Sequence, residues 1–288
     1  MKNVIFILAL ALFSTVTTAQ DKPAYLLFDK DGKQVSYSDM LKTISKSDVV
    51  LIGELHNNPI SHWLQFEITK DLYAEDENLV LGAEMFEADN QTIINEFLEG
   101  TIKERHFEAE MKLWDNYKTD YKPLISFAKK NNLPFIATNI PRRYASLVAR
   151  SGYEGLDALP DETKKWFAPL PFPFDKNAPG YKEMMDMGMG HGMGMEPENM
   201  VKAQAVKDAT MAHFIMENRP KKGIFVHYQG DYHSANGGGI VWYLKEAQKR
   251  LDVVTISSNV SDTMEWDEGF NGKADFILVI PSSMTTTY

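Results

Sequence analysis

The chain has 288 residues, of which 44% are hydrophobic, and this suits one large domain, with or without an inserted subdomain, around a packed core. Its formal net charge of −10 at pH 7 argues against binding to the phosphates of nucleic acid. The absence of Cys excludes disulfides, thiolate metal sites and lipid attachment at an N-terminal Cys.

The N-terminal segment, residues 1–19, has the pattern of a secretory signal peptide. Lys2 precedes the apolar run from Val4 to Phe13, and small residues up to Ala19 offer a cleavage site. A membrane anchor is the alternative, but the run is short for a bilayer and no later segment approaches about 20 apolar residues. We therefore expect an exported, soluble protein, periplasmic or extracellular, with one domain over residues 20–288 and no transmembrane segment in the mature chain.

Short apolar runs recur along the mature chain with helical patterns between them. Such alternation predicts an α/β fold with a mostly parallel central sheet flanked by helices. The expected strands are 49–52, 79–83, 135–138, 224–226, 253–256 and 276–280. The expected helices are 60–75, 89–99, 104–114, 121–131, 142–150, 202–218 and 238–250.

The first run leads into LIGELHNNPISHWLQ, where Glu54 and His56 follow directly on a predicted strand. Gly53 permits a sharp turn there, and Pro59 is well suited to open a helix. Ligands of open α/β sheets bind beyond the carboxyl ends of the strands, so both side chains are site candidates. A hydrogen-bonded pair in the core is the alternative. In the same way, Glu84 and Glu87 follow the second run.

About 85 residues without a clear strand separate the third and fourth runs, which predicts an inserted helical lid subdomain at roughly 142–202. It contains MMDMGMGHGMGM, residues 184–195, whose Gly residues each disfavour a helix by roughly 1 kcal/mol relative to Ala. Three interpretations remain open for this loop: a linker, a Met-lined lid over an apolar ligand, and a trap for Cu(I). The lid is the leading functional interpretation.

In the helix predicted at 202–218, Gln204, Asp208 and Met211 follow i, i+4, i+7 spacing and share one stripe. A polar pair continued by Met suggests that the stripe borders a cleft, although an exposed face remains the alternative.

The fourth run leads into HYQGDYHSANGGG, where Gly230 permits a turn and His233 follows. Tyr228 and Tyr232 crowd the same edge of the sheet. The glycine run at the start of the next helix can receive an anion on its free N–H groups, or it can be a plain tight connection.

Two histidines and two carboxylates thus follow predicted strands of one sheet: Glu54, His56, Glu84 and His233. Imidazole and carboxylate both suit a divalent metal such as Zn, Mn or Fe. A polar site for some other ligand is the alternative.

Over roughly residues 45–282 the sequence resembles the ChaN-like haem-binding family, within the group that includes Tiki, TraB and erythromycin-esterase-like proteins. The resemblance rests on IGELHNNP, LGAEMFE, TIKERHFEAEMKLWDNY, YKPLISFAKKNNLPFIATNIPRR, AQAVKDATMAHFI and YQGDYHSANGGGI, in this order and spacing. It implies an α/β fold with a helical lid and a role in haem binding or iron acquisition. The Met-rich segment has no counterpart in the family pattern, and the lack of Cys separates the chain from lipoprotein members.

The leading expectation is therefore an exported haem-binding protein of haem or iron uptake, possibly a homodimer. Haem needs apolar walls, an axial ligand and donors for two propionates. Tyr228, Tyr232 and His233 are the axial candidates, Arg142 and Arg143 the propionate candidates, and Gln204, Asp208 and Met211 border the cleft.

The alternative expectation is a metal-dependent hydrolase, a protease or esterase of the Tiki kind. The resemblance places Gly53-Glu54-Leu55-His56, Glu84 and Gly230-Asp231-Tyr232-His233 at that family's metal centre. Glu54 or Glu84 would then be the catalytic general base on a metal-bound water.

Overall fold

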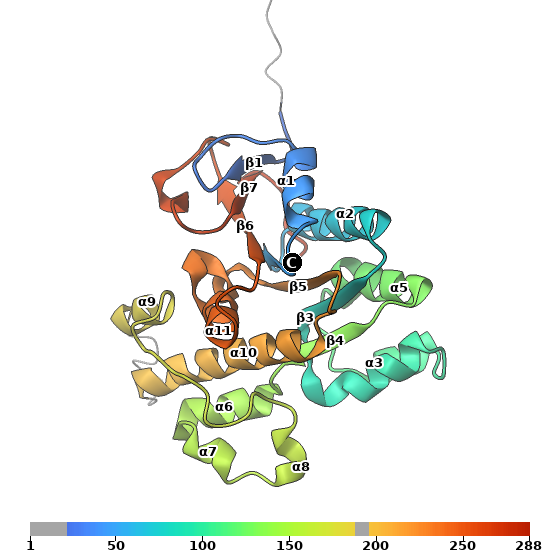
Figure 1. Cartoon of the computed structure of the whole chain (residues 1–288), viewed down its shortest axis with the longest axis vertical. Coiled ribbons are helices and arrows are strands. Elements are labelled where there is room, and N and C mark those ends of the chain that lie inside the picture. Colours follow the sequence, from blue (N-terminus) through green and yellow to red (C-terminus); the bar gives the residue numbers. More distant parts are fainter. Residues whose placement is uncertain (1–21, 188–195) are drawn as a thin grey trace, which may run out of the picture.

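The computed structural model describes residues 22–187 and 196–288. Its centre is one seven-stranded sheet in the order β1-β7-β6-β2-β5-β3-β4 (Figure 1). The strands are β1 (Leu26–Asp29), β2 (Val49–Glu54), β3 (Leu79–Glu87), β4 (Phe135–Asn139), β5 (Ile224–Gly230), β6 (Val253–Ser261) and β7 (Phe276–Pro281). Each expected run lies in a strand, and these strands are parallel, which confirms the predicted fold class. The short edge strand β1, antiparallel to β7, was not expected.

The expected helices are also present, with shifted ends. The main ones are α2 (Pro59–Glu75), α3 (Gln91–Leu98), α4 (Glu104–Glu110), α5 (Lys122–Asn131), α6 (Arg142–Ser151), α10 (Pro197–Asn218) and α11 (Gly239–Ala247). The sequence pattern missed α1 (Tyr37–Ile44) and the short α7 (Glu154–Asp157), α8 (Asp161–Lys164) and α9 (Tyr181–Asp186). None of the helices within 22–187 or 196–288 is both long and apolar enough to cross a bilayer.

Helices cover both faces of the sheet, and alternate residues of each strand face opposite layers. Val50 and Ile52 of β2 belong to the core cluster that includes α2 and α5, whereas Val49 and Leu51 belong to the cluster of α10 and α11. Strands buried on both faces are continuous apolar runs, and this explains why the sequence shows no in-and-out alternation there.

Between β4 and β5 the described residues form α6 to α10 and no strand. Val148 of α6, Leu156 of α7 and Val206 of α10 share a separate small core, which α6 and α7 build against α10 (Figure 1). The lid role of residues 142–202 stays a prediction. Of the Met-rich segment, residues 188–195 lie outside the described residues, as does the expected signal peptide at 1–19.

The local sequence after β2 sets the entry into the site. Asn58 caps α2, because its Oδ1 accepts hydrogen bonds from the N–H groups of Ile60 and Ser61, and Pro59 is the first helical residue. Only three residues therefore separate the end of β2 from the cap. This short connection holds Glu54 and His56 at the carboxyl edge of the sheet.

Candidate functional site

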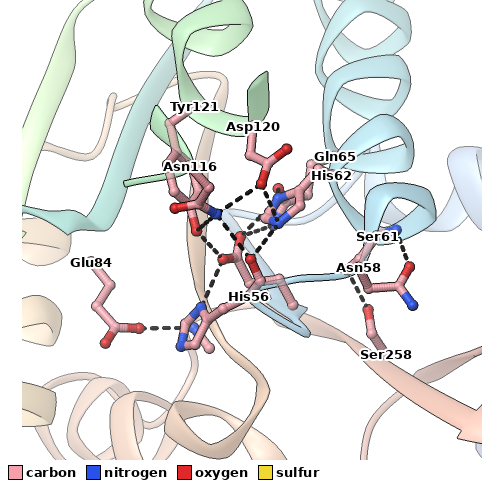
Figure 2. A network of polar contacts seen from close by, with 12 residues as sticks. His56, Asn58, Ser61, His62, Gln65, Glu84, Asn116, Asp120, Tyr121 and Ser258 are labelled. Carbon is pink, nitrogen blue, oxygen red and sulfur yellow. Dashed lines mark hydrogen bonds and ion pairs between the residues drawn. The ribbon is translucent and has the colours of Figure 1, made fainter. Parts of the chain in front are cut away.

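Glu54, the last residue of β2, is a buried carboxylate that accepts hydrogen bonds from three other parts of the chain. Gln65 Nε2 on α2 lies 2.6 Å from Oε2, and the Tyr121 hydroxyl lies 2.6 Å from Oε1. His56 Nδ1 is 2.8 Å from Oε1 (Figure 2). These partners compensate for the cost of burying a charged group.

The bond to Glu54 fixes the orientation of His56. With Nδ1 donating to the carboxylate, Nε2 is the ring nitrogen left to act as a base or a ligand. A side chain at Gly230 would not fit here, because its Cβ would lie 2.8 Å from Nε2 and Cε1 of His56. Burial disfavours protonation of the ring, but the hydrogen bond to Glu54 and its charge raise the pKa of His56 above 6.5.

The His56 side chain remains 37% exposed, and the edge of its ring meets Trp114 at a centroid distance of 5.0 Å. The ring is thus held in place while about a third of the side chain remains exposed.

Glu84 and His233 form a second pair across the sheet. His233 Nε2 lies 3.0 Å from Glu84 Oε1, and the Gly230 N–H donates to Glu84 Oε2 at 2.8 Å. Despite burial, the charge of His233 and these bonds hold the pKa of Glu84 well below its usual range. On the other side of the ring, His233 Nδ1 contacts Asp208 Oδ1 at 2.5 Å. Burial opposes the charged ring, but the two carboxylates raise the pKa of His233 to about 10.

The polar residues expected on one stripe of α10 do converge on His233. Gln204 Nε2 lies 3.0 Å from His233 Nδ1, and Asp208, whose pKa is raised by burial, also accepts a hydrogen bond from Tyr181 at 2.6 Å. Met211, in contrast, is fully buried in the core between α10 and the sheet. Its expected place beside a cleft is wrong, because the stripe enters the core there.

The axial haem candidates occupy three different environments. Tyr228 is fully buried on the α2 face of the sheet, with its hydroxyl 2.6 Å from Thr69 Oγ1, so the expectation that it faces the ligand edge is wrong. Tyr232 is 43% exposed, and its hydroxyl donates to the Gly180 carbonyl oxygen. His233 is buried with both ring nitrogens in contact with carboxylates.

The expected metal-binding set does not assemble as one centre. Glu54 pairs with His56 and Glu84 with His233, and within residues 22–187 and 196–288 no group of three or more His, Asp or Glu side chains is arranged to hold a metal ion. The expected Zn, Mn or Fe centre is therefore not supported. The Cu(I) site was assigned to residues 184–195, most of which lie outside the described residues.

A cavity of about 690 Å³ opens beside Glu84. Its wall combines apolar side chains with acidic and basic ones: Glu84, Met85, Glu87, Lys112, Leu113, Trp114, Asp115, Asn116, Asn139, Ile140, Arg142, Lys207 and Tyr288. Arg142, one of the two propionate candidates, thus lines this cavity. Arg143 does not line the cavity: it binds Asp89 and lies over the rings of Tyr144 and Trp166.

The sequence pattern missed a polar layer behind Glu54. His62 Nε2 lies 3.0 Å from the His56 carbonyl oxygen and 3.4 Å from Asp120 Oδ2, and Asn116 Nδ2 donates to the same carbonyl at 2.9 Å (Figure 2). The spacing of His62 and Gln65 on one face of α2 was the available clue. Asn116 precedes a short π-helix, Tyr117–Tyr121, which contains Asp120 and Tyr121, and only the fold shows that these three residues are buried here.

Comparison with known proteins places this geometry in a family. The family model described as "Haem-binding uptake, Tiki superfamily, ChaN" matches residues 40–244. A structure described as cofacial heme binding to ChaN of Campylobacter jejuni superposes with a TM-score of 0.67 at 18% identity, over 89% of this chain and 96% of that one. A Bacillus cereus protein structure superposes with a TM-score of 0.51 at 12% identity, over 86% and 92% of the two chains. At these identities, the two structures establish the fold alone.

Among curated proteins, RETICULATA-RELATED 5, chloroplastic, of Arabidopsis thaliana is 24% identical over 200 residues, which is 65% of this chain. The match covers 26% of the plant protein, so this chain spans about a quarter of that relative. The family model, in contrast, covers well over half of the chain and includes both carboxylate–histidine pairs. The chain belongs to the haem-binding uptake family ChaN of the Tiki superfamily.

Proposed function

We propose that this protein binds haem in the cavity at the carboxyl edge of the sheet. Family membership supports this, and the cavity suits the ligand in size, because sites for small molecules and cofactors measure about 300–1,000 Å³. Met85, Leu113 and Trp114 offer apolar and aromatic surface to a flat macrocycle. The same wall also carries charged side chains, which an amphipathic ligand requires beside the apolar ones.

Basic side chains of the wall provide partners for the two haem propionates. Arg142 and Lys207 line the cavity together with Lys112, which is paired with Glu87 at 2.9 Å. Charge-assisted hydrogen bonds from Arg to carboxylates are strong and directional. Arg142 is therefore the residue on which we expect propionate binding to depend most.

We assign His56 as the iron ligand. His56 does not itself line the cavity, but the edge of its ring meets Trp114, which does, and its hydrogen bond to Glu54 is the observation that carries the proposal. Histidines that bind metals characteristically donate their other ring N–H to a carboxylate, which fixes the tautomer and orientation. Glu54 does this for His56 through Nδ1. Of the earlier axial candidates, Tyr228 is in the core and His233 is held between two carboxylates, which favours His56 over both.

Titration of the purified protein with haemin, followed through the Soret band, tests the proposal. We expect a saturable spectral shift, altered in position by His56→Ala and weakened about tenfold by Arg142→Ala. Arg143→Ala is the matched control, since Arg143 binds Asp89 outside the cavity, and it should retain the wild-type affinity. A spectrum that remains that of free haemin throughout would refute haem binding.

We further propose export through the N-terminal segment and a role in haem or iron uptake. The apolar run after Lys2 and the family description support this. Growth of the source organism on haemin as its sole iron source should depend on the protein. The proposed homodimer can be tested by measuring the mass of the protein in solution with and without haemin.

The Glu54–His56 pair also favours a second candidate function, a hydrolase. A carboxylate-oriented imidazole on a partly exposed side chain is suited to general-base catalysis on a water molecule. The metal-dependent version lacks support, because the four expected ligands form two separate pairs. A panel of ester and peptide substrates should show turnover that His56→Ala abolishes; no turnover alongside haemin binding would eliminate this candidate.

A further inference from the structure

The segment that follows β7 returns to the site. The Thr287 N–H donates a hydrogen bond to the Asn57 carbonyl oxygen at 2.9 Å, and the Thr287 hydroxyl lies 3.5 Å from Asp120 Oδ2. Asn57 is the residue after His56, and Asp120 belongs to the polar layer behind it. The segment therefore contacts the loop that carries His56.

The approach of this segment is directed by packing as well as by these hydrogen bonds. Met284 packs against the core cluster on the α2 face, and its N–H bonds to the Pro281 carbonyl oxygen at the end of β7. The three threonines after Met284 span the distance to the site loop. The contacts of Met284 and Thr287 thus define the path of the segment that leads to Tyr288.

This path places Tyr288 in the wall of the cavity. Tyr288 lines the cavity together with Trp114 and Arg142, and it is 67% exposed. Tyr288 is therefore available for contact with a molecule in the cavity.

We propose that residues 285–288 form a wall of the binding site, in which Thr287 fixes the segment to the site loop and Tyr288 contacts the bound ligand. The ligand class is a flat aromatic molecule, and for haem the inference rests on the proposed function. An aromatic ring that is two-thirds exposed in a cavity gains favourable contact when such a ligand covers it. The rigid ring loses little conformational entropy in doing so.

The anchoring step can be tested without any ligand. Thr287→Pro removes the N–H that bonds to Asn57, whereas Thr287→Ala keeps it. Hydrogen exchange of the backbone at residues 55–58 should accelerate in Thr287→Pro and stay near wild type in Thr287→Ala. Equal exchange in both variants would overturn the anchoring.

The contact step is tested by haemin titration of Tyr288 variants. Tyr288→Ala should weaken binding about tenfold, and Tyr288→Phe, which keeps the ring, should bind within about twofold of wild type. Wild-type affinity in Tyr288→Ala, with normal binding by the unmodified protein, would overturn the contact and leave the proposed function intact. Absence of haemin binding in the unmodified protein would instead refute the function and the haem contact together, and hydrogen exchange would still decide the anchoring.

Discussion

At the scale of single residues, the candidate site consists of largely buried acidic and histidine side chains, each of which has hydrogen-bond or ion-pair partners. Glu54 accepts from His56, Gln65 and Tyr121, and His233 lies between Glu84 and Asp208. Leaving one member of such a network unpaired costs more than the pair contributes, because the remaining charge stays buried. The network therefore fixes side-chain positions more than it adds stability.

Gly230 is the residue whose replacement tests the position of His56 most simply. In Gly230→Ala the new Cβ would lie 2.8 Å from the His56 ring, so the ring must move away from its bond with Glu54. We expect haemin affinity to fall at least about tenfold, and the free energy of unfolding to fall by about 1–3 kcal/mol.

Gly272→Ala is the control. A Cβ there meets nothing within 4 Å, but the φ of +74° at this position is unfavourable for Ala. It should be destabilised and yet bind haemin normally. If both variants bind equally well, the close approach of Gly230 to His56 has no role in binding.

The charged His233 makes the stability of the fold depend on pH. Its pKa is raised from 6.5 to about 10, so it contributes stability that is fully present below 6.5 and lost as the pH rises through about 10. Glu84 acts in the opposite sense: its pKa is lowered from 4.5, so its contribution is present above 4.5 and lost in strong acid.

Urea unfolding across this range measures the effect. The free energy of unfolding should fall between pH 6.5 and 10, and the fall should be smaller in His233→Gln, which cannot titrate. An equal fall in both proteins would show that other groups cause it and that His233 is not held as a cation.

At the scale of elements, α10 shows how one helix serves both the site and the core. Gln204 and Asp208 contact His233, while Met211 packs in the interior. With a rise of about 1.5 Å per residue, Met211 lies about 10 Å along the axis from Gln204. The same stripe therefore passes from the edge of the sheet to its centre.

Met211→Ala is expected to lower the free energy of unfolding by about 2–5 kcal/mol, as removal of a buried Met side chain does. Haemin affinity should stay unchanged, because Met211 does not reach the cavity. Thermal melting together with haemin titration measures both. A stable variant with weakened haemin binding would place Met211 at the ligand after all.

These elements also show how far sequence alone reaches. The strands were predictable because runs such as 49–52 and 224–226 are apolar on both faces. The polar residues after these runs, Glu54, Glu84 and His233, do lie at the carboxyl edge of the sheet, and their role in a site stays a prediction. The side of the sheet on which the Tyr228 side chain lies could not be predicted, because a strand buried on both faces shows no alternation of apolar and polar residues. The contribution of Asn116, Asp120 and Tyr121 depends on packing between segments distant in sequence.

At the scale of the whole molecule, the parallel strands gather the ends of β2, β3 and β5 at one edge, and helices cover both faces. Ligands of open α/β sheets bind beyond the carboxyl ends of the strands. The helical segment between β4 and β5 contributes Arg142 of α6 and Lys207 of α10 to the cavity wall.

At the same scale, the proposed export predicts a defined processed product. We expect protein secreted from its native host to begin after Ala19, as the small residues of Thr17-Thr18-Ala19 indicate. Mass spectrometry of the intact protein from the extracellular or periplasmic fraction determines this. An intact N-terminus beginning at Met1 in the cell interior would contradict export.

The structure of the protein crystallised with haemin tests the central claim most directly. The account predicts haem in the cavity beside Glu84, with the iron at His56 Nε2 and a propionate at Arg142. Haem bound elsewhere on the molecule, or a cavity without haem under saturating conditions, would contradict it.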